Sequence, residues 1–113
     1  MTYTDATYDW VKVAALIGDA GSALQDSLEQ EDHDPVALRL WRLGSNALLM
    51  TPMPHANLRD AYKVLPRAVS DPRDLLLRAE ELTRSHSIEQ FPSGASAVIV
   101  ELIDVIRDHF EER

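Results

Sequence analysis

The chain lacks several features that would narrow its function. Its 113 residues include no cysteine, so disulfides, thiolate nucleophiles and cysteine metal ligands are all excluded. The absence of cysteine is typical of proteins from a reducing compartment, and we therefore expect a cytoplasmic location. No apolar run approaches the ~20 residues that a membrane-spanning helix needs, so we expect no membrane association. The first ten residues carry two aspartates and no basic residue, which is unlike a secretory signal.

Basic residues are also few. The sequence has 11 lysines and arginines against 19 aspartates and glutamates, which gives a net charge of −8. This charge disfavours nucleic acid and anionic membranes, and it favours solubility or a partner with a basic surface. The charge is unevenly placed, because residues 1–50 carry −5, residues 51–90 are neutral and residues 91–113 carry −3. If the first and last helices lie side by side, one face of the molecule is acidic.

What the chain does have is a helical repeat of apolar residues over most of its length. Near the N-terminus the apolar positions step by three or four: Ala6, Trp10, Val13, Ile17, Ala20 and Leu24. Near the C-terminus the same spacing appears at Ala95, Ile99, Leu102 and Ile106. Such stripes are typical of amphipathic α-helices. The hydrophobic content of 45% is that of a globular chain, so we predict an all-α fold, an antiparallel four- to five-helix bundle that forms one domain over residues 1–113.

Capping residues and prolines predict where the helices begin and end. We expect helices over residues 5–30, 35–50, 55–65, 72–86 and 94–112. The expected N-caps share a short polar side chain that can accept a backbone N–H: Thr4, Asp34, Asp71 and Ser93. Proline follows two of these caps directly, at a position where its missing N–H costs no hydrogen bond.

The last of these segments contains a conflict between propensity and periodicity. Residues 97–106 are rich in β-branched side chains, which favour strands. Acidic residues arbitrate, since Glu101, Asp104, Asp108 and Glu111 recur at a helical spacing and cannot alternate across a sheet. We therefore predict a helix and no strand.

The apolar stripes also predict a core. Eleven side chains are expected to be buried: Trp10, Val13, Ile17, Leu40, Trp41, Leu48, Leu75, Leu82, Ile99, Leu102 and Ile106. Gly18 and Gly21 lie inside the first helix, where glycine costs about 1 kcal/mol relative to alanine. We interpret them as a close helix–helix approach or a mild break in the helix, and a hinge or a ligand-facing notch is the alternative.

No motif for catalysis, a metal or a cofactor stands out. The four histidines are His33, His55, His86 and His109, and none belongs to a His-Glu-x-x-His motif or has another histidine four residues away. His109 and Glu112 resemble half of a carboxylate-bridged di-iron site, but no second inward Glu-x-x-His exists. We therefore expect no catalytic residue, no metal and no cofactor.

These observations favour a small acidic helical module that binds another protein without catalysis. An antitoxin, an immunity-type protein or another inhibitory or regulatory partner of a basic protein would suit the charge. The expected partner-binding residues are the acidic ones of the two terminal segments: Asp26, Glu29, Glu31, Asp32, Glu101, Asp104 and Asp108.

Two alternatives stay open. One is a structural homodimer, or a subunit that packs through an apolar helix face. The other is a helix-turn-helix-like nucleic-acid binder that uses Arg67, Arg73, Arg78 and Arg84. This second alternative is disfavoured because the segment around these arginines is electrically neutral, so nearby carboxylates would face the same phosphates.

Overall fold

The computed structural model describes residues 4–26, 35–51 and 71–110, and within them the chain is helical. Four α-helices are present there: α1 (Asp5–Asp26), α2 (Pro35–Leu49), α4 (Pro72–Thr83) and α5 (Ala95–Val105). A short 3-10 helix, η1 (Ile88–Gln90), precedes α5, and a π-helical turn, η2 (Ile106–Phe110), continues it. The predicted all-α class is thus confirmed for the described residues, which contain no strand. The helix expected over residues 55–65 and the cap expected at Asp34 lie outside them.

The β-branched segment is helical, as the acidic spacing predicted. Val98 to Ile103 all lie within α5, where Val98 and Leu102 are buried and Val100 and Ile103 are exposed. Burial of one face against other helices therefore outweighs the strand preference of the individual side chains.

Helix starts follow local capping chemistry in two of the three places where they can be examined. The backbone N–H of Thr7 donates to Thr4 Oγ1 at 3.2 Å, and that of Arg73 donates to Asp71 Oδ1 at 3.1 Å. The expected cap at Ser93 is wrong. Gly94 is the N-cap of α5, with φ 92° and no side-chain hydrogen bond. Glycine adopts this left-handed conformation without strain, so the turn before α5 is set by the backbone.

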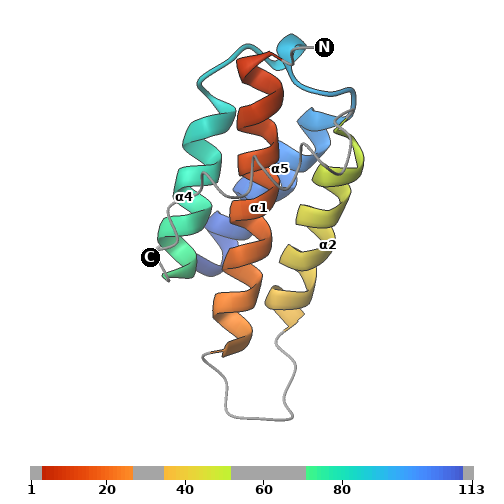
Figure 1. The fold of residues 1–113 in the computed structure, drawn as a ribbon. Helices are drawn as coiled ribbons and strands as arrows, with labels where there is room; N and C mark the ends of the chain where they lie inside the picture. The colour runs from red at the N-terminus through yellow and green to blue at the C-terminus, as the bar shows by residue number, and fades with distance from the viewer. Residues whose placement is uncertain (1–3, 27–34, 52–70, 111–113) are drawn as a thin grey trace.

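The helix α1 is the centre of the structure. It lies between α2 and α4 and packs on both, while α5 crosses behind and has its main contacts with α2 and α4 (Figure 1). Burial follows from this position, because α1 hides apolar side chains on nearly all sides, including Val11, Val13 and Leu16. The first and last helices, α1 and α5, are therefore not each other's main packing partners. The acidic face expected from the sequence depended on these two helices lying side by side.

Glycine allows α1 and α2 to approach closely. A Cβ atom on Gly21 would lie 2.9 Å from Trp41 Cδ1, and one on Gly44 would lie 3.0 Å from the carbonyl oxygen of Ala14 and 3.1 Å from the backbone nitrogen of Gly18. A Cβ on Gly18 would meet nothing within 4 Å. The predicted close approach is confirmed at Gly21. At Gly18 the close neighbour is Gly44, which lies against the backbone of Gly18.

Seven of the eleven expected core residues are buried, and four are only partly so. The buried ones are Trp10, Val13, Ile17, Leu40, Leu75, Leu102 and Ile106. Leu48, Leu82 and Ile99 are only partly buried, although they pack against the core. Trp41 is also partly buried, so the expectation that it is a core residue is wrong.

The two tryptophans show why the expectation failed. The indole of Trp10 is fully buried, and its Nε1 donates to the carbonyl oxygen of Ala47 at 2.9 Å. Trp41 instead packs over Gly21 at the edge between α1 and α2, and its Nε1 donates to Ser22 Oγ at 3.2 Å. Periodicity alone does not separate the centre of an interface from its edge.

Candidate functional site

Three of the predicted partner-binding acids lie on the C-terminal helix, and each contacts an arginine. Glu101 accepts a hydrogen bond from Arg39 Nε, which joins α5 to α2. Asp104 Oδ1 accepts from Arg107 Nη2 at 2.8 Å, and Asp108 Oδ1 lies 3.6 Å from Arg107 Nε. These acids are therefore brought together, but their charge is balanced in part by neighbouring cations.

The structure says less about the other four predicted acids. Asp26 is the last residue of α1. Glu29, Glu31 and Asp32 lie outside the described residues, so their relation to the acids of α5 stays a prediction.

The pair of Arg39 and Glu101 is the polar link between α2 and α5. The hydrogen bond from Arg39 lowers the pKa of Glu101, and the same bond raises the pKa of Arg39. Attraction to Asp104 and Asp108 raises the pKa of Arg39 further, so its guanidinium lies in an acidic environment. Both side chains are more than a third exposed, so this link contributes little stability, ~0–1 kcal/mol.

An open groove lies beside this pair, between α2 and α5. Its volume is about 840 Å³. Buried Leu43 and Val98 contribute apolar lining, and the exposed side chains of Leu38 and Leu49 add to it. Arg42 also lines the groove and forms no ion pair with any of the carboxylates that the structure describes. We call the groove and the side chains around it the α2–α5 face, with Leu38, Arg42, Leu49, Ala97 and Glu101.

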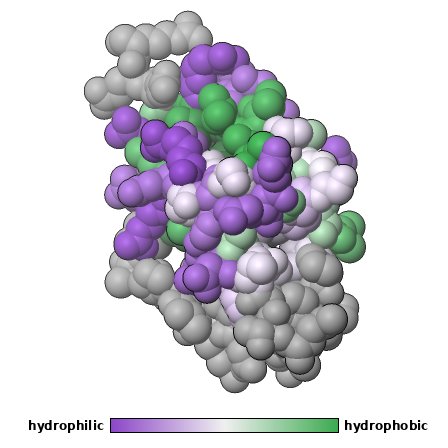
Figure 2. Space-filling view, turned by 90° about the horizontal axis from the view of Figure 1, so that it is seen from above, coloured by the Kyte–Doolittle hydropathy of each residue, from purple (hydrophilic) through white to green (hydrophobic). Residues whose placement is uncertain are grey.

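The α2–α5 face exposes much apolar surface. Leu49 is 83% exposed and Leu38 45%, which are large fractions for aliphatic side chains on helices. Figure 2, a view of the molecule from above, shows hydrophobic residues exposed among hydrophilic ones on that side. Exposed apolar clusters of this kind are typical of interaction sites. Charge patterning of the sequence did not reveal this face, because Leu38 and Leu49 are uncharged and were not among the expected core or partner-binding residues.

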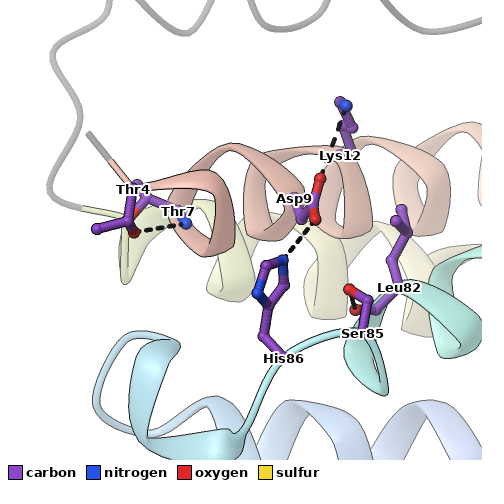
Figure 3. A network of polar contacts seen from close by, with 7 residues as sticks. All are labelled: Thr4, Thr7, Asp9, Lys12, Leu82, Ser85 and His86. Carbon is purple, nitrogen blue, oxygen red and sulfur yellow. Dashed lines mark hydrogen bonds and ion pairs between the residues drawn. The ribbon is translucent and has the colours of Figure 1, made fainter. Parts of the chain in front are cut away.

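A second polar arrangement joins α1 to the segment that follows α4 (Figure 3). The carboxylate of Asp9 lies 2.7 Å from His86 Nε2 and 3.6 Å from Lys12 Nζ. The imidazole rests edge-on against Phe91 at 5.8 Å between ring centroids, and Phe91 in turn contacts Trp10 at 5.3 Å. Sequence reasoning missed this contact, since 77 residues separate its two partners and no local pattern marks it.

A histidine held by a carboxylate can act as a general base only when a nucleophile or a substrate proton is within reach. The hydroxyl of the preceding residue, Ser85, donates to the carbonyl oxygen of Leu82 at 2.7 Å. No hydroxyl of the described residues is hydrogen-bonded to His86. The arrangement thus matches a structural contact between α1 and the segment that follows α4 better than it matches a catalytic dyad.

Metal and membrane chemistry find no support in the part of the chain that the structure describes. Nowhere in residues 4–26, 35–51 and 71–110 do three histidine, aspartate or glutamate side chains gather as metal ligands would. None of the helices in those ranges is both long and apolar enough to cross a membrane.

The arginines of the helix-turn-helix alternative do not form a common basic surface in the described structure. Arg73 and Arg78 are exposed on α4, together with Asp74 and Glu81. Arg84 pairs with Glu80 at 3.1 Å, and Arg67 lies outside the described residues.

Comparison with known proteins adds no further constraint. No protein-family profile matches the chain, and no curated protein or solved structure shows significant similarity to it. The function is therefore argued from the geometry and charge of the chain itself.

Proposed function

We propose that this protein is a small acidic helical module that binds and regulates a basic partner protein, without catalysis. The observation that carries the proposal is where the charge lies. Residues 1–34 contain eight acidic residues and one lysine, so they carry −7 of the net charge of −8. By contrast α2, α5 and η2 together hold three arginines and three acids, and are neutral.

Several of these acids lie at or directly after the C-terminal end of α1. Asp26 ends the helix, and its last turn contains no basic residue. Negative charge near a helix C-terminus is unfavourable by about 0.3–1 kcal/mol, because the backbone carbonyls there already carry partial negative charge. Glu29, Glu31 and Asp32 follow directly in the sequence. A cationic partner surface at this end would relieve the repulsion, and its association would be accelerated by the field of these acids.

The acids of α5 have a smaller part in this proposal. Glu101 is tied to Arg39, while Asp104 and Asp108 share Arg107. Their charge is therefore offset in part by neighbouring cations.

The proposal also includes the finer features expected from the sequence. The chain is taken to be an antiparallel bundle and a single domain, which the central position of α1 between α2 and α4 supports. A cytoplasmic location is supported by the absence of cysteine.

A pair of matched charge reversals tests the proposal on the partner that co-purifies from the native source. Glu29→Lys with Glu31→Lys should slow association about tenfold or more and flatten its dependence on salt. The control, Glu81→Lys with Glu89→Lys, changes the net charge equally at two exposed glutamates elsewhere. It should slow association much less.

Two results would contradict this function. Equal effects of the two variants would mean that only overall charge matters and that the end of α1 is not the contact surface. If neither variant changes the association rate, the acids serve solubility alone.

A further inference from the structure

The α2–α5 face is a second surface, separate from the acidic end of α1. We propose that it binds a second copy of this chain, in a two-fold symmetric dimer. The groove of about 840 Å³ would receive apolar side chains of the partner copy, and the arginines and acids around it would pair across the interface. This dimer is independent of the proposed basic partner, which is assigned to a different surface.

The apolar side chains supply the first argument. Leu49 and Leu38 line the groove from α2 and are 83% and 45% exposed. Buried Leu43 and Val98 extend the apolar surface into the groove. A single copy leaves these side chains in water, whereas a second copy on the same face would bury them.

Charge selects a second copy over other occupants. Two molecules of charge −8 repel each other on most of their surfaces. Together α2, α5 and η2 are neutral, so two copies that meet here repel each other less than they would at the acidic end of α1. A strongly basic partner would find little excess negative charge here, and a strongly acidic one little excess positive charge.

The arrangement of these charges also fits a two-fold axis. In an isologous interface each contact occurs twice, so one face must carry both members of every pair. Arg42 on α2 has no carboxylate partner within the described chain, while on the neighbouring helix Asp104 and Asp108 share Arg107. Arg42 of each copy can therefore pair with an acid on α5 or η2 of the other.

The size of the face sets the expected affinity. The 15 residues of α2 span about 22 Å, and two neighbouring helices are roughly 20 Å wide, so each copy offers on the order of 400–500 Å². Stable interfaces bury about 800 Å² per partner, so we expect a weak dimer with a Kd in the micromolar range.

Sedimentation velocity over about 1 to 200 μM tests the dimer by mass action. The wild type should shift from monomer to dimer across this range. Leu49→Glu should remain monomeric throughout, and because Leu49 is exposed, its circular dichroism should stay unchanged. The matched control is Leu77→Glu on α4, also an exposed leucine but away from the groove, which should dimerise like the wild type.

A charge swap tests the pairing itself. Arg42→Glu should weaken self-association about tenfold, and so should Asp104→Arg with Asp108→Arg. An equimolar mixture of these two variants should recover association as a heterodimer, which each variant alone lacks. A monomeric wild type at the highest concentration, an equal loss in Leu77→Glu, or a mixture that fails to associate would each overturn the proposal. None of these results would bear on the acidic end of α1.

Discussion

The two sides of α2 are packed in opposite ways. Toward α1 the helices approach so closely that Gly21 and Gly44 have no room for a Cβ atom. Toward α5 the same helix leaves an open groove, bridged at one point by Arg39 and Glu101. Small residues let backbones meet and exclude water, whereas long charged side chains hold helices apart. The comparison teaches that stability and surface for binding are built on different sides of one helix.

The largest effect on stability is expected where α1 meets the C-terminal end of α2. Trp10→Ala should lower the free energy of unfolding by about 3–5 kcal/mol, because it empties a fully buried site and removes the bond to Ala47. Chemical denaturation measures this. Trp10→Phe is the milder control, since Thr51 Oγ1 still donates to the same carbonyl oxygen at 3.4 Å. A loss below about 1 kcal/mol for Trp10→Ala would show that this side is not the stable one.

A smaller effect is expected from one methyl group at the close approach of α1 and α2. Gly44→Ala should cost about 1–3 kcal/mol, because its Cβ meets backbone atoms that cannot move aside easily. Gly18→Ala is the matched control within the same contact. It has free space, and should instead stabilise by up to about 1 kcal/mol through helix propensity. If both substitutions stabilise, the two helices are further apart than described.

On the open side the ion pair should matter little. Glu101→Gln is expected to cost at most about 1 kcal/mol at neutral pH. Because the folded state lowers the pKa of Glu101, the contribution is present above the ordinary glutamate pKa of about 4.3 and is lost as the pH falls through the folded value. Denaturation should therefore show a smaller difference between wild type and variant at about pH 3 than at pH 7. The control is Glu81→Gln, at an exposed glutamate on α4, which should cost less at pH 7 than Glu101→Gln.

The smallest effect on stability is expected at the groove itself. Leu49→Ala should change the free energy of unfolding by less than about 0.5 kcal/mol, because its side chain is already in water. Thermal denaturation at low protein concentration, where the chain is monomeric, measures this. A loss above about 2 kcal/mol would mean that Leu49 belongs to the core and that the two sides of α2 are alike.

Much of the fold followed from local rules that the sequence displays directly. The helical repeat around Trp10 and Leu102 and the cap at Asp71 depend on neighbours a few residues away, so spacing was enough to predict them. The prediction of Ser93 as a cap was wrong because Gly94, with a positive φ, is the N-cap of α5. The side-chain type of Ser93 does not reveal this backbone conformation. Trp41 failed as a core residue because its place at an edge depends on Gly21 of another helix.

The candidate site was less predictable, for a related reason. Charge counting marked Glu101, Asp104 and Asp108 as acidic surface, but one of the cations that offset them, Arg39, is brought in by tertiary structure. The bond between Arg39 and Glu101 spans 62 residues, and the groove beside it exists only once both helices are packed.

The position of α1 has a consequence for synthesis of the chain. Trp10 packs on Phe91 and Asp9 binds His86, so the first helix made is completed by segments translated about 80 residues later. At ~5–20 residues per second, the ribosome holds α1 for roughly 4–16 seconds before those partners emerge. During that interval the apolar sides of α1 face the ribosome exit, chaperones or α2 alone. Nascent chains stalled before residue 72, where α4 begins, should therefore be the species most prone to aggregation and proteolysis.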